Sequence, residues 1–144
     1  MKLSTRTRYG MRAMLELAEE YGKGPLQIKV MAQNQDISIK YLEQLMTILK
    51  TSGFIRSIRG PRGGYLLAKD PGQVKLSEIF TALEGPLVTA ECVEDKNYCA
   101  RASDCVTRQL WTQVQNVIYN LLDSMTLKDL VKKTKDKKAL YYQI

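Results

Sequence analysis

The chain has 144 residues, of which 44% are hydrophobic, and its formal net charge is +7. This length fits one domain with a small appendage, and the positive charge favours a polyanionic partner such as DNA. No apolar stretch is long enough to cross a membrane, and the first residues lack the apolar core of a signal peptide, so we expect a cytoplasmic protein without membrane contact.

Capping and turn residues divide the first part of the chain into predicted helices. Ser4 can cap a first helix, whose apolar residues recur at helical spacing until Gly22 ends it. A short second helix carries Ile28 and Met31. Asp36 suits the tight turn after this helix, because aspartate tolerates left-handed backbone geometry.

A third helix is predicted over residues 39–51. Ser38 is a good N-cap for this helix, and Gly53 follows it in the position that a C-terminal glycine prefers. Its buried side is expected to be an apolar stripe at three- and four-residue steps. The stripe consists of Leu42, Leu45, Met46 and Leu49.

A two-stranded hairpin is predicted next, with strands over residues 54–59 and 65–68. The turn between the strands, residues 60–64, reads Gly-Pro-Arg-Gly-Gly. Three helices followed by a hairpin is the order of a winged helix-turn-helix. The expected fold class is therefore mainly α with a small β-hairpin wing.

The second half of the chain is predicted to contain a helix over residues 76–84 and a long helix over about residues 106–123. One face of the long helix is apolar, and since this helix outruns the small DNA-binding core, we expect it to mediate dimerisation. Residues 126–129, Thr-Leu-Lys-Asp, resemble a capping box that opens a last short helix. The lysine-rich residues 132–138 are expected to be a solvated tail.

The predicted organisation has three parts along the chain. Residues 1–85 form the winged helix-turn-helix domain, residues 86–105 form a loop that bears the cysteines, and residues 106–144 form the dimerisation helix and the C-terminal tail. One winged helix reads only a few base pairs, which also favours a homodimer on a double-stranded operator.

The third helix and the hairpin carry the residues that we expect to contact DNA. Lysine and arginine neutralise phosphates, Gln44 can bond an adenine edge, and Glu43 can accept from a cytosine amino group. Arginine at a glycine-rich hairpin tip can enter a narrow minor groove. A solvated surface helix and a tight turn with solvated arginines are the alternative interpretations. The predicted DNA-binding residues are Ser38, Lys40, Glu43, Gln44, Arg59 and Arg62.

The only three cysteines of the chain lie close together, in the loop of residues 91–105. Clustered thiols in a cytoplasmic protein indicate a soft-metal site, and an odd number argues against a closed disulfide framework. The residues between the cysteines are polar, so a role as small buried hydrophobes is the weaker alternative. The predicted metal ligands are Cys92, Cys99 and Cys105, and the expected cofactor is an iron–sulfur cluster.

Histidine is absent from the chain. This absence excludes Ser–His–Asp and Cys–His catalytic arrangements, and no pair of carboxylates is suggested as catalytic. We therefore expect a protein that is not an enzyme.

Several motifs of this sequence resemble those of the IscR-type iron–sulfur cluster regulators, a winged-helix family that also includes NsrR and CymR. The resemblance covers nearly the whole chain. Its most specific segments are residues 1–4 with 8–9, residues 37–38 with 41–45, residues 59–67, the three cysteines and residues 110–111.

The resemblance implies a homodimeric winged-helix repressor or activator whose long helices cross at the dimer interface. It also implies that the cysteine loop holds a 2Fe–2S cluster, with 4Fe–4S as the other form that three cysteines allow. Cluster occupancy would change which promoters are bound, including those of iron–sulfur cluster biogenesis genes. Glu43 and Gln44 would lie on the recognition helix, and Arg59 would lie in the wing.

The fourth cluster ligand is the point at which this chain departs from the family pattern. IscR-like proteins can use a histidine three residues after the last cysteine, where this chain has Arg108. NsrR-like proteins can use an acidic residue of the partner subunit near the N-terminus, where this chain has Arg8. The remaining candidates are Glu91, Glu94, Asp95, Asp104, Thr107, Gln109, a partner-chain carboxylate such as Glu43, and a small thiol or water.

Two branches of the same family supply alternative functions. An NsrR-like protein would be a repressor that senses nitric oxide or redox change. A CymR-like protein would regulate cysteine metabolism without a cluster, and the three cysteines would then be incidental.

Overall fold

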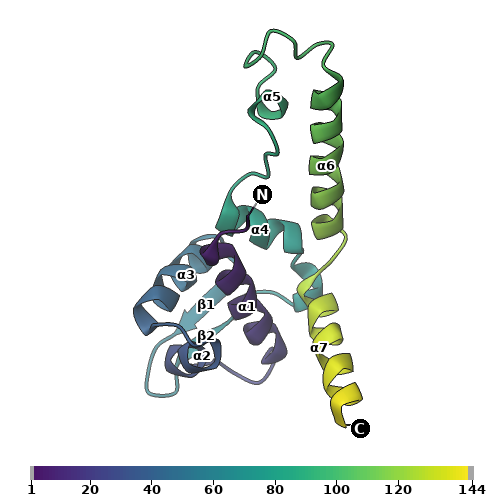
Figure 1. The fold of residues 1–144 in the computed structure, drawn as a ribbon. Helices are drawn as coiled ribbons and strands as arrows, with labels where there is room; N and C mark the ends of the chain where they lie inside the picture. The colour runs from purple at the N-terminus through teal and green to yellow at the C-terminus, as the bar shows by residue number, and fades with distance from the viewer. Residues whose placement is uncertain (1, 143–144) are drawn as a thin grey trace.

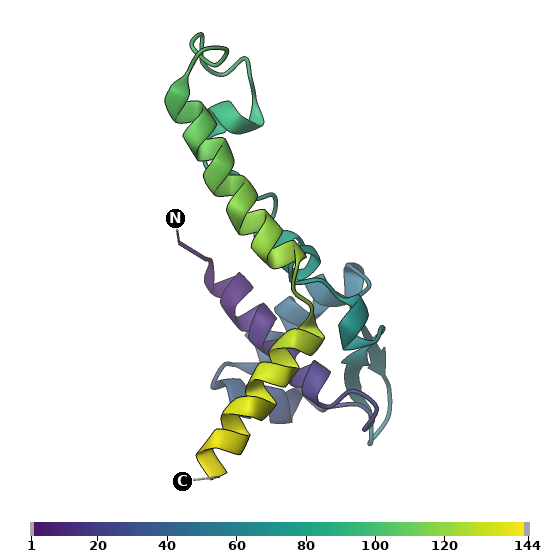
Figure 2. The same ribbon diagram turned by 90° about the vertical axis from the view of Figure 1, so that its right-hand side faces the viewer.

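The computed structural model describes residues 2–142, and residues 1, 143 and 144, at the ends of the first and third predicted parts, lie outside it. Four helices and a hairpin form a body, α6 extends away from this body with the cysteine loop at its far end, and α7 lies along α1 (Figures 1 and 2). The elements are α1 (Thr5–Glu19), α2 (Ile28–Gln35), α3 (Ile39–Thr51), β1 (Ile55–Ile58), β2 (Gly64–Leu67), the 3-10 helix η1 (Pro71–Gln73), α4 (Leu76–Glu84), α5 (Glu91–Glu94), α6 (Val106–Asp123) and α7 (Leu127–Tyr142). None of the helices in this described range is both long enough and apolar enough to cross a membrane.

The predicted fold class is confirmed, because the chain is mainly helical and β1 pairs with β2 in a two-stranded antiparallel hairpin. The local capping signals act as expected. The Ser4 Oγ accepts a hydrogen bond from the Thr7 N–H at 3.1 Å, and the Ser38 Oγ accepts one from the Tyr41 N–H at 3.0 Å. Asp36 has a φ of 54°, the left-handed geometry that its turn requires.

Two predicted segments differ from the structure. The last helix is not short, because α7 continues through residues 132–138, although the lysines there are exposed as expected. Helix is favoured because the capping box forms, with the Thr126 N–H donating to Asp129 Oδ2 at 2.9 Å, and because lysine, leucine and alanine are good helix formers. The cysteine loop also contains one helical turn, α5, which begins at Glu91.

The hydrophobic core lies where α1, α2, α3, α4 and the hairpin meet, and α7 adds the buried Leu127 and packs the half-buried Leu130 and Val131 against it. Each fully buried large apolar side chain contributes roughly 1.5–3 kcal/mol relative to an exposed one. The predicted stripe of α3 is part of this core, whereas α6 has no buried residue. The largest fully buried side chains are Met14, Leu17, Met31, Leu42, Leu45, Met46, Leu49, Val74, Ile79, Leu83 and Leu127.

The base of α6 is fastened to the start of α4. The Leu76 N–H donates to the Met125 carbonyl at 2.9 Å, just after α6 ends. Asp123, the last residue of α6, accepts a hydrogen bond from the Ser77 Oγ at 2.8 Å and lies 3.5 Å from the Lys75 Nζ. These contacts fix one end of α6 to the body, while the other end extends away from it (Figure 1).

The first turns of α1 and the last turn of α4 form a close junction. A Cβ added at Gly10 would lie 2.6 Å from the buried Leu83 Cδ1, so a larger residue would displace Leu83 from the core. The Glu84 Oε2 accepts hydrogen bonds from the Thr7 Oγ1 and, at 2.8 Å, from the Ser4 Oγ. The Thr7 bond first, and then the Ser4 bond, lower the pKa of Glu84 below its ordinary value.

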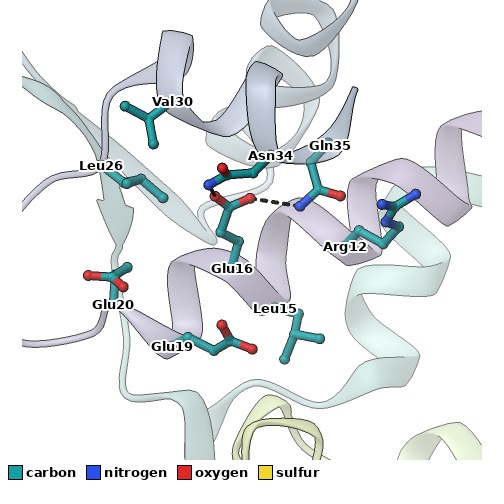
Figure 3. A pocket seen from close by; sticks show the side chains of 9 residues that line it. All are labelled: Arg12, Leu15, Glu16, Glu19, Glu20, Leu26, Val30, Asn34 and Gln35. Carbon is teal, nitrogen blue, oxygen red and sulfur yellow. Dashed lines mark hydrogen bonds between the residues drawn. The ribbon is translucent and has the colours of Figure 1, made fainter. Parts of the chain in front are cut away.

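A carboxylate of α1 holds α2 in place. Glu16 accepts hydrogen bonds from the Asn34 Nδ2 at 2.6 Å and from the Gln35 Nε2 at 2.7 Å (Figure 3). The three side chains line one side of a groove of about 470 Å³, which Arg12 and Leu26 also line. Because α2 and α3 together form the helix-turn-helix, these bonds set the position of that helix pair on α1.

Glu84→Gln is expected to destabilise the chain at neutral pH but not in acid. The ionised carboxylate is the stronger acceptor for the two hydroxyls, so we expect the free energy of unfolding at pH 7 to fall by about 1 kcal/mol. Because the pKa of Glu84 is lowered in the folded state, this stabilisation is complete above the ordinary glutamate pKa of about 4.3 and disappears as the pH falls through the folded value. Urea unfolding at stepwise lower pH measures the difference.

Glu43→Gln, on the exposed face of α3, replaces the same side chain away from this junction and is the matched control for that experiment. A loss in Glu84→Gln that is the same at every pH would contradict a role for the negative charge.

Candidate DNA-reading surface and cysteine loop

The polar face of α3 lies opposite the buried stripe of the same helix. Ser38, Lys40, Glu43 and Gln44 are all exposed. Glu43 and Gln44 lie three and four residues after Lys40, which places all three on one face of the helix. The Oγ of Ser38 also caps the N-terminus of α3. The four predicted residues are thus all exposed, with Lys40, Glu43 and Gln44 on one face of α3 and Ser38 at its start.

The hairpin carries Arg59 and Arg62 at its exposed tip. The Gly63 N–H donates to the Gly60 carbonyl at 2.9 Å, which closes the turn between the two arginines. A Cβ at Gly63 would collide with the carbonyl oxygen of Ile58, so this tight turn requires glycine. Arg59 and Arg62 therefore lie at a turn whose backbone conformation is well defined.

The wing is also anchored to the segment before α2. The residue pattern does not predict this contact. The Leu26 N–H donates to the Tyr65 carbonyl at 2.8 Å, and the Tyr65 N–H donates to the Leu26 carbonyl at 2.9 Å. The Gln27 Nε2 reaches the Pro61 carbonyl at 3.4 Å. The one signal in the sequence is Gly64, because a Cβ there would collide with the backbone of Leu26 and glycine within a strand indicates such a close approach.

The three predicted metal ligands lie in different parts of the cysteine loop. Cys92 is half-buried in α5, Cys99 is exposed, and Cys105 is half-buried directly before α6. All three are free thiols. Within residues 2–142, no group of three or more cysteine and acidic side chains is arranged to hold a metal ion. The structure places the thiols in one loop but not in the arrangement of a three-ligand metal site.

Cys105 is the N-cap of α6. Its Sγ accepts a hydrogen bond from the Arg108 N–H at 3.4 Å and lies 3.2 Å from the Thr107 Oγ1. The Thr107 hydroxyl first, and then the Arg108 N–H, lower the pKa of the Cys105 thiol below its ordinary value. A helix N-terminus favours the thiolate, which is the form that binds metals.

Arg108 binds the backbone of the loop with its side chain. The Nε donates to the Cys92 carbonyl at 2.7 Å, and one terminal nitrogen, Nη1, donates to the Ala102 carbonyl at 3.4 Å. A guanidinium stays protonated and has no lone pair to offer a metal, so Arg108 is a loop contact and not a ligand. From the sequence, Arg108 is recognisable only as an unsuitable ligand, because contacts to backbone carbonyls leave no pattern in a sequence.

The segment that leads into the loop lies along α6. The Thr89 N–H donates to the Gln115 Oε1 at 3.1 Å, and the Thr89 Oγ1 donates to the Trp111 carbonyl at 2.9 Å. The loop is therefore held beside the end of α6 that lies farthest from the body (Figure 1).

Most of the predicted apolar face of α6 is exposed in the single chain, while Ile118 and Leu122 near its base are half-buried. Beside its base, an apolar groove of about 550 Å³ lies between α1, α4 and α6, and Met11, Phe80 and Ile118 are among its lining residues. An exposed apolar surface that continues into an apolar groove marks a contact surface for another molecule. The exposed large apolar residues of α6 include Val106, Leu110, Trp111, Val114, Val117 and Leu121.

The chain is similar to known transcription regulators over most of its length. The Rrf2 family model, described as an iron-dependent transcriptional regulator, matches residues 3–133. The regulator CymR of Bacillus subtilis is 38% identical over 141 residues, which cover 98% of this chain and 97% of CymR. The regulator IscR of Cronobacter sakazakii is 36% identical over 131 residues, which cover 91% of this chain and 80% of IscR.

Solved structures show the same likeness. The structure of CymR, the global cysteine regulator of B. subtilis, matches with a TM-score of 0.80 at 39% identity and covers 92% of this chain and 98% of CymR. The structure of T. potens IscR matches with a TM-score of 0.78 at 36% identity and covers 95% of this chain and 90% of that protein. These relatives confirm the predicted resemblance, and they are regulators rather than enzymes. The chain therefore belongs to the Rrf2 family of transcriptional regulators.

Proposed function

We propose that this chain is a homodimeric regulator that binds a double-stranded DNA operator and senses iron–sulfur status through a cluster held by its cysteine loop. The observation that carries the proposal is a loop with three free thiols, connected through α6 to a winged helix-turn-helix. Iron–sulfur cluster biogenesis genes are the proposed targets.

The DNA contact is proposed to combine α3 in the major groove with the wing in the minor groove. Glu43 and Gln44 would read base edges, because a carboxylate accepts from cytosine and an amide pairs with adenine. Arg59 would enter the minor groove, where a narrow groove attracts a cation. The remaining proposed contacts come from Ser38, Lys40 and Arg62.

Dimerisation is supported by the exposed apolar face of α6. The α6 of a second copy would cover this face, as the hydrophobic effect favours. Two winged-helix bodies on one pair of long helices would then contact two half-sites of an operator, which a single body is too small to do.

The donor chemistry of the loop fits a thiolate-held cluster, because sulfur ligands from cysteine are those that iron–sulfur clusters take. Cys92, Cys99 and Cys105 would hold the cluster after the loop draws them together. Gain or loss of a bound cluster would change the conformation of the loop. The proposed form is 2Fe–2S, with 4Fe–4S as the alternative, and a loop carboxylate such as Glu91 or an external thiol would complete the ligand set.

A cluster-free regulator of cysteine metabolism is the second candidate. It is favoured by the separation of the thiols and by the use of Arg108 in loop contacts. The match to CymR over 98% of this chain supports it as well. In this case the cysteines would be incidental, and metal would not change operator binding.

Arg59→Ala is expected to weaken operator binding by about tenfold and to lower its salt dependence, because one cationic contact to the duplex is lost. The measurement is fluorescence anisotropy at several salt concentrations, on a duplex that the wild-type protein selects from a random library. Lys138→Ala, on the exposed outer half of α7, removes the same charge and is the matched control. Equal losses in both variants would mean that only net charge matters.

Val114→Asp is expected to convert a dimer into a monomer, because it places a charge within the apolar face of α6. The mass from light scattering should fall from twice 16.4 kDa to 16.4 kDa. Asn116→Asp adds the same charge nearly on the opposite side of the helix and should leave the dimer intact. A dimer that survives Val114→Asp would place the subunit interface elsewhere.

Anaerobic reconstitution with iron and sulfide is expected to give visible charge-transfer bands in the wild-type protein and none in Cys92→Ala. Ser103→Ala, at an exposed position of the same loop, is the control and should keep the bands. Counting iron and sulfide separates 2Fe–2S from 4Fe–4S. If the wild-type protein gives no bands and Cys92→Ala leaves operator affinity unchanged, the cluster-free candidate is the better one.

A further inference from the structure

We propose that Arg108 is a latch that holds the cysteine loop in a resting conformation with its thiols apart. A group that binds across the three thiols must then displace the Arg108 side chain from the loop backbone. This inference rests on the proposed sensing role of the loop, and it concerns the step before any group is bound.

The latch is built from contacts to three separate points of the loop. The Arg108 Nε binds the Cys92 carbonyl at 2.7 Å, near the start of the loop. The Nη1 binds the Ala102 carbonyl at 3.4 Å, after the turn that carries Cys99. The backbone N–H of Arg108 binds the Cys105 Sγ at 3.4 Å, where the loop meets α6. One residue thus connects the start of the loop with two points near its end.

Polar contacts such as these must provide most of the stability of the loop, because the loop has almost no buried core. Ala102 is the only buried residue between positions 91 and 105, and it is 8% exposed. Hydrogen bonds from a charged donor are stronger than those between neutral groups, and the half-buried position of Arg108 limits competition from water. Removing this side chain takes away the bonds to the Cys92 and Ala102 carbonyls, whereas the backbone N–H bond to Cys105 remains.

The resting conformation opposes the assembly of a three-thiol site. Cys92 lies within α5, and its carbonyl is held by Arg108, while Cys105 is held at the first turn of α6. Drawing the sulfurs together requires α5 and the turn at Cys99 to move relative to α6. That movement stretches the Arg108 bonds, so losing Arg108 should make assembly easier.

The first test measures how strongly Arg108 restrains the loop in the absence of metal. Reduced wild-type, Arg108→Ala, Arg108→Lys and Arg101→Ala proteins are alkylated with iodoacetamide, and mass spectrometry follows each cysteine. In Arg108→Ala the half-buried Cys92 should react about fivefold faster relative to the exposed Cys99, the size expected for lost hydrogen bonds of this kind. Arg108→Lys, which keeps the charge but lacks the planar donors, should show a smaller increase. Arg101→Ala should match the wild-type ratio.

The second test measures the direction of the effect on metal binding. Cobalt(II) is titrated anaerobically into each reduced protein, and cobalt–thiolate absorption reports assembly of the thiols. We expect Arg108→Ala to bind cobalt about fivefold more tightly than the wild-type protein, because no latch has to be released. A residue that only maintains the loop fold would weaken cobalt binding when removed. Circular dichroism confirms that each variant is folded.

The outcomes separate this inference from the proposed function. An unchanged ratio of Cys92 to Cys99 alkylation, or weaker cobalt binding in Arg108→Ala, overturns the latch. If no protein gives cobalt–thiolate bands, the three-thiolate site is wrong, and the alkylation ratio still decides whether Arg108 holds the loop.

Discussion

The close contact between α1 and α4 is the joint on which both halves of the molecule depend. Gly10 lets Leu83 approach α1, and Glu84 binds the first turn of the same helix. On one side of this joint, α1 supports α2 and the helix that presents the polar face. On the other side, α4 receives the base of α6 and leads into the cysteine loop. Direct contacts therefore connect the base of α6 with the candidate DNA-reading surface.

Packing is unevenly distributed between these two halves. The body holds most of the buried side chains, whereas α6 has none and the cysteine loop has only Ala102. Segments with few buried contacts open at low free energy, while the core around α3 opens only when the whole domain unfolds. The loop can therefore exchange its polar contacts while the body keeps its structure.

Local signals make most of the fold predictable, because they act within a few residues of their own position. Asp36 and Ser38 define the turn and the start of α3 in this way. The anchoring of the wing by Leu26 and the contacts of Arg108 join segments that are apart in the chain or involve only backbone carbonyls, so no residue pattern indicates them. The presence of three thiols is evident from the sequence, but their separation depends on how α5 packs beside α6. The DNA-binding residues are exposed as their pattern predicts, and their contacts with a duplex stay a prediction.

The wing is held to the body by Leu26 and Tyr65 in the free chain, and glycines fix its tip. A mobile hairpin would lose conformational entropy on entering a groove, roughly 1–2 kcal/mol for each residue that becomes ordered. An anchored hairpin has already lost this entropy during folding, so its arginines would meet DNA with little further ordering. The affinity that the wing adds should then come mainly from released counterions, with only a small change in heat capacity.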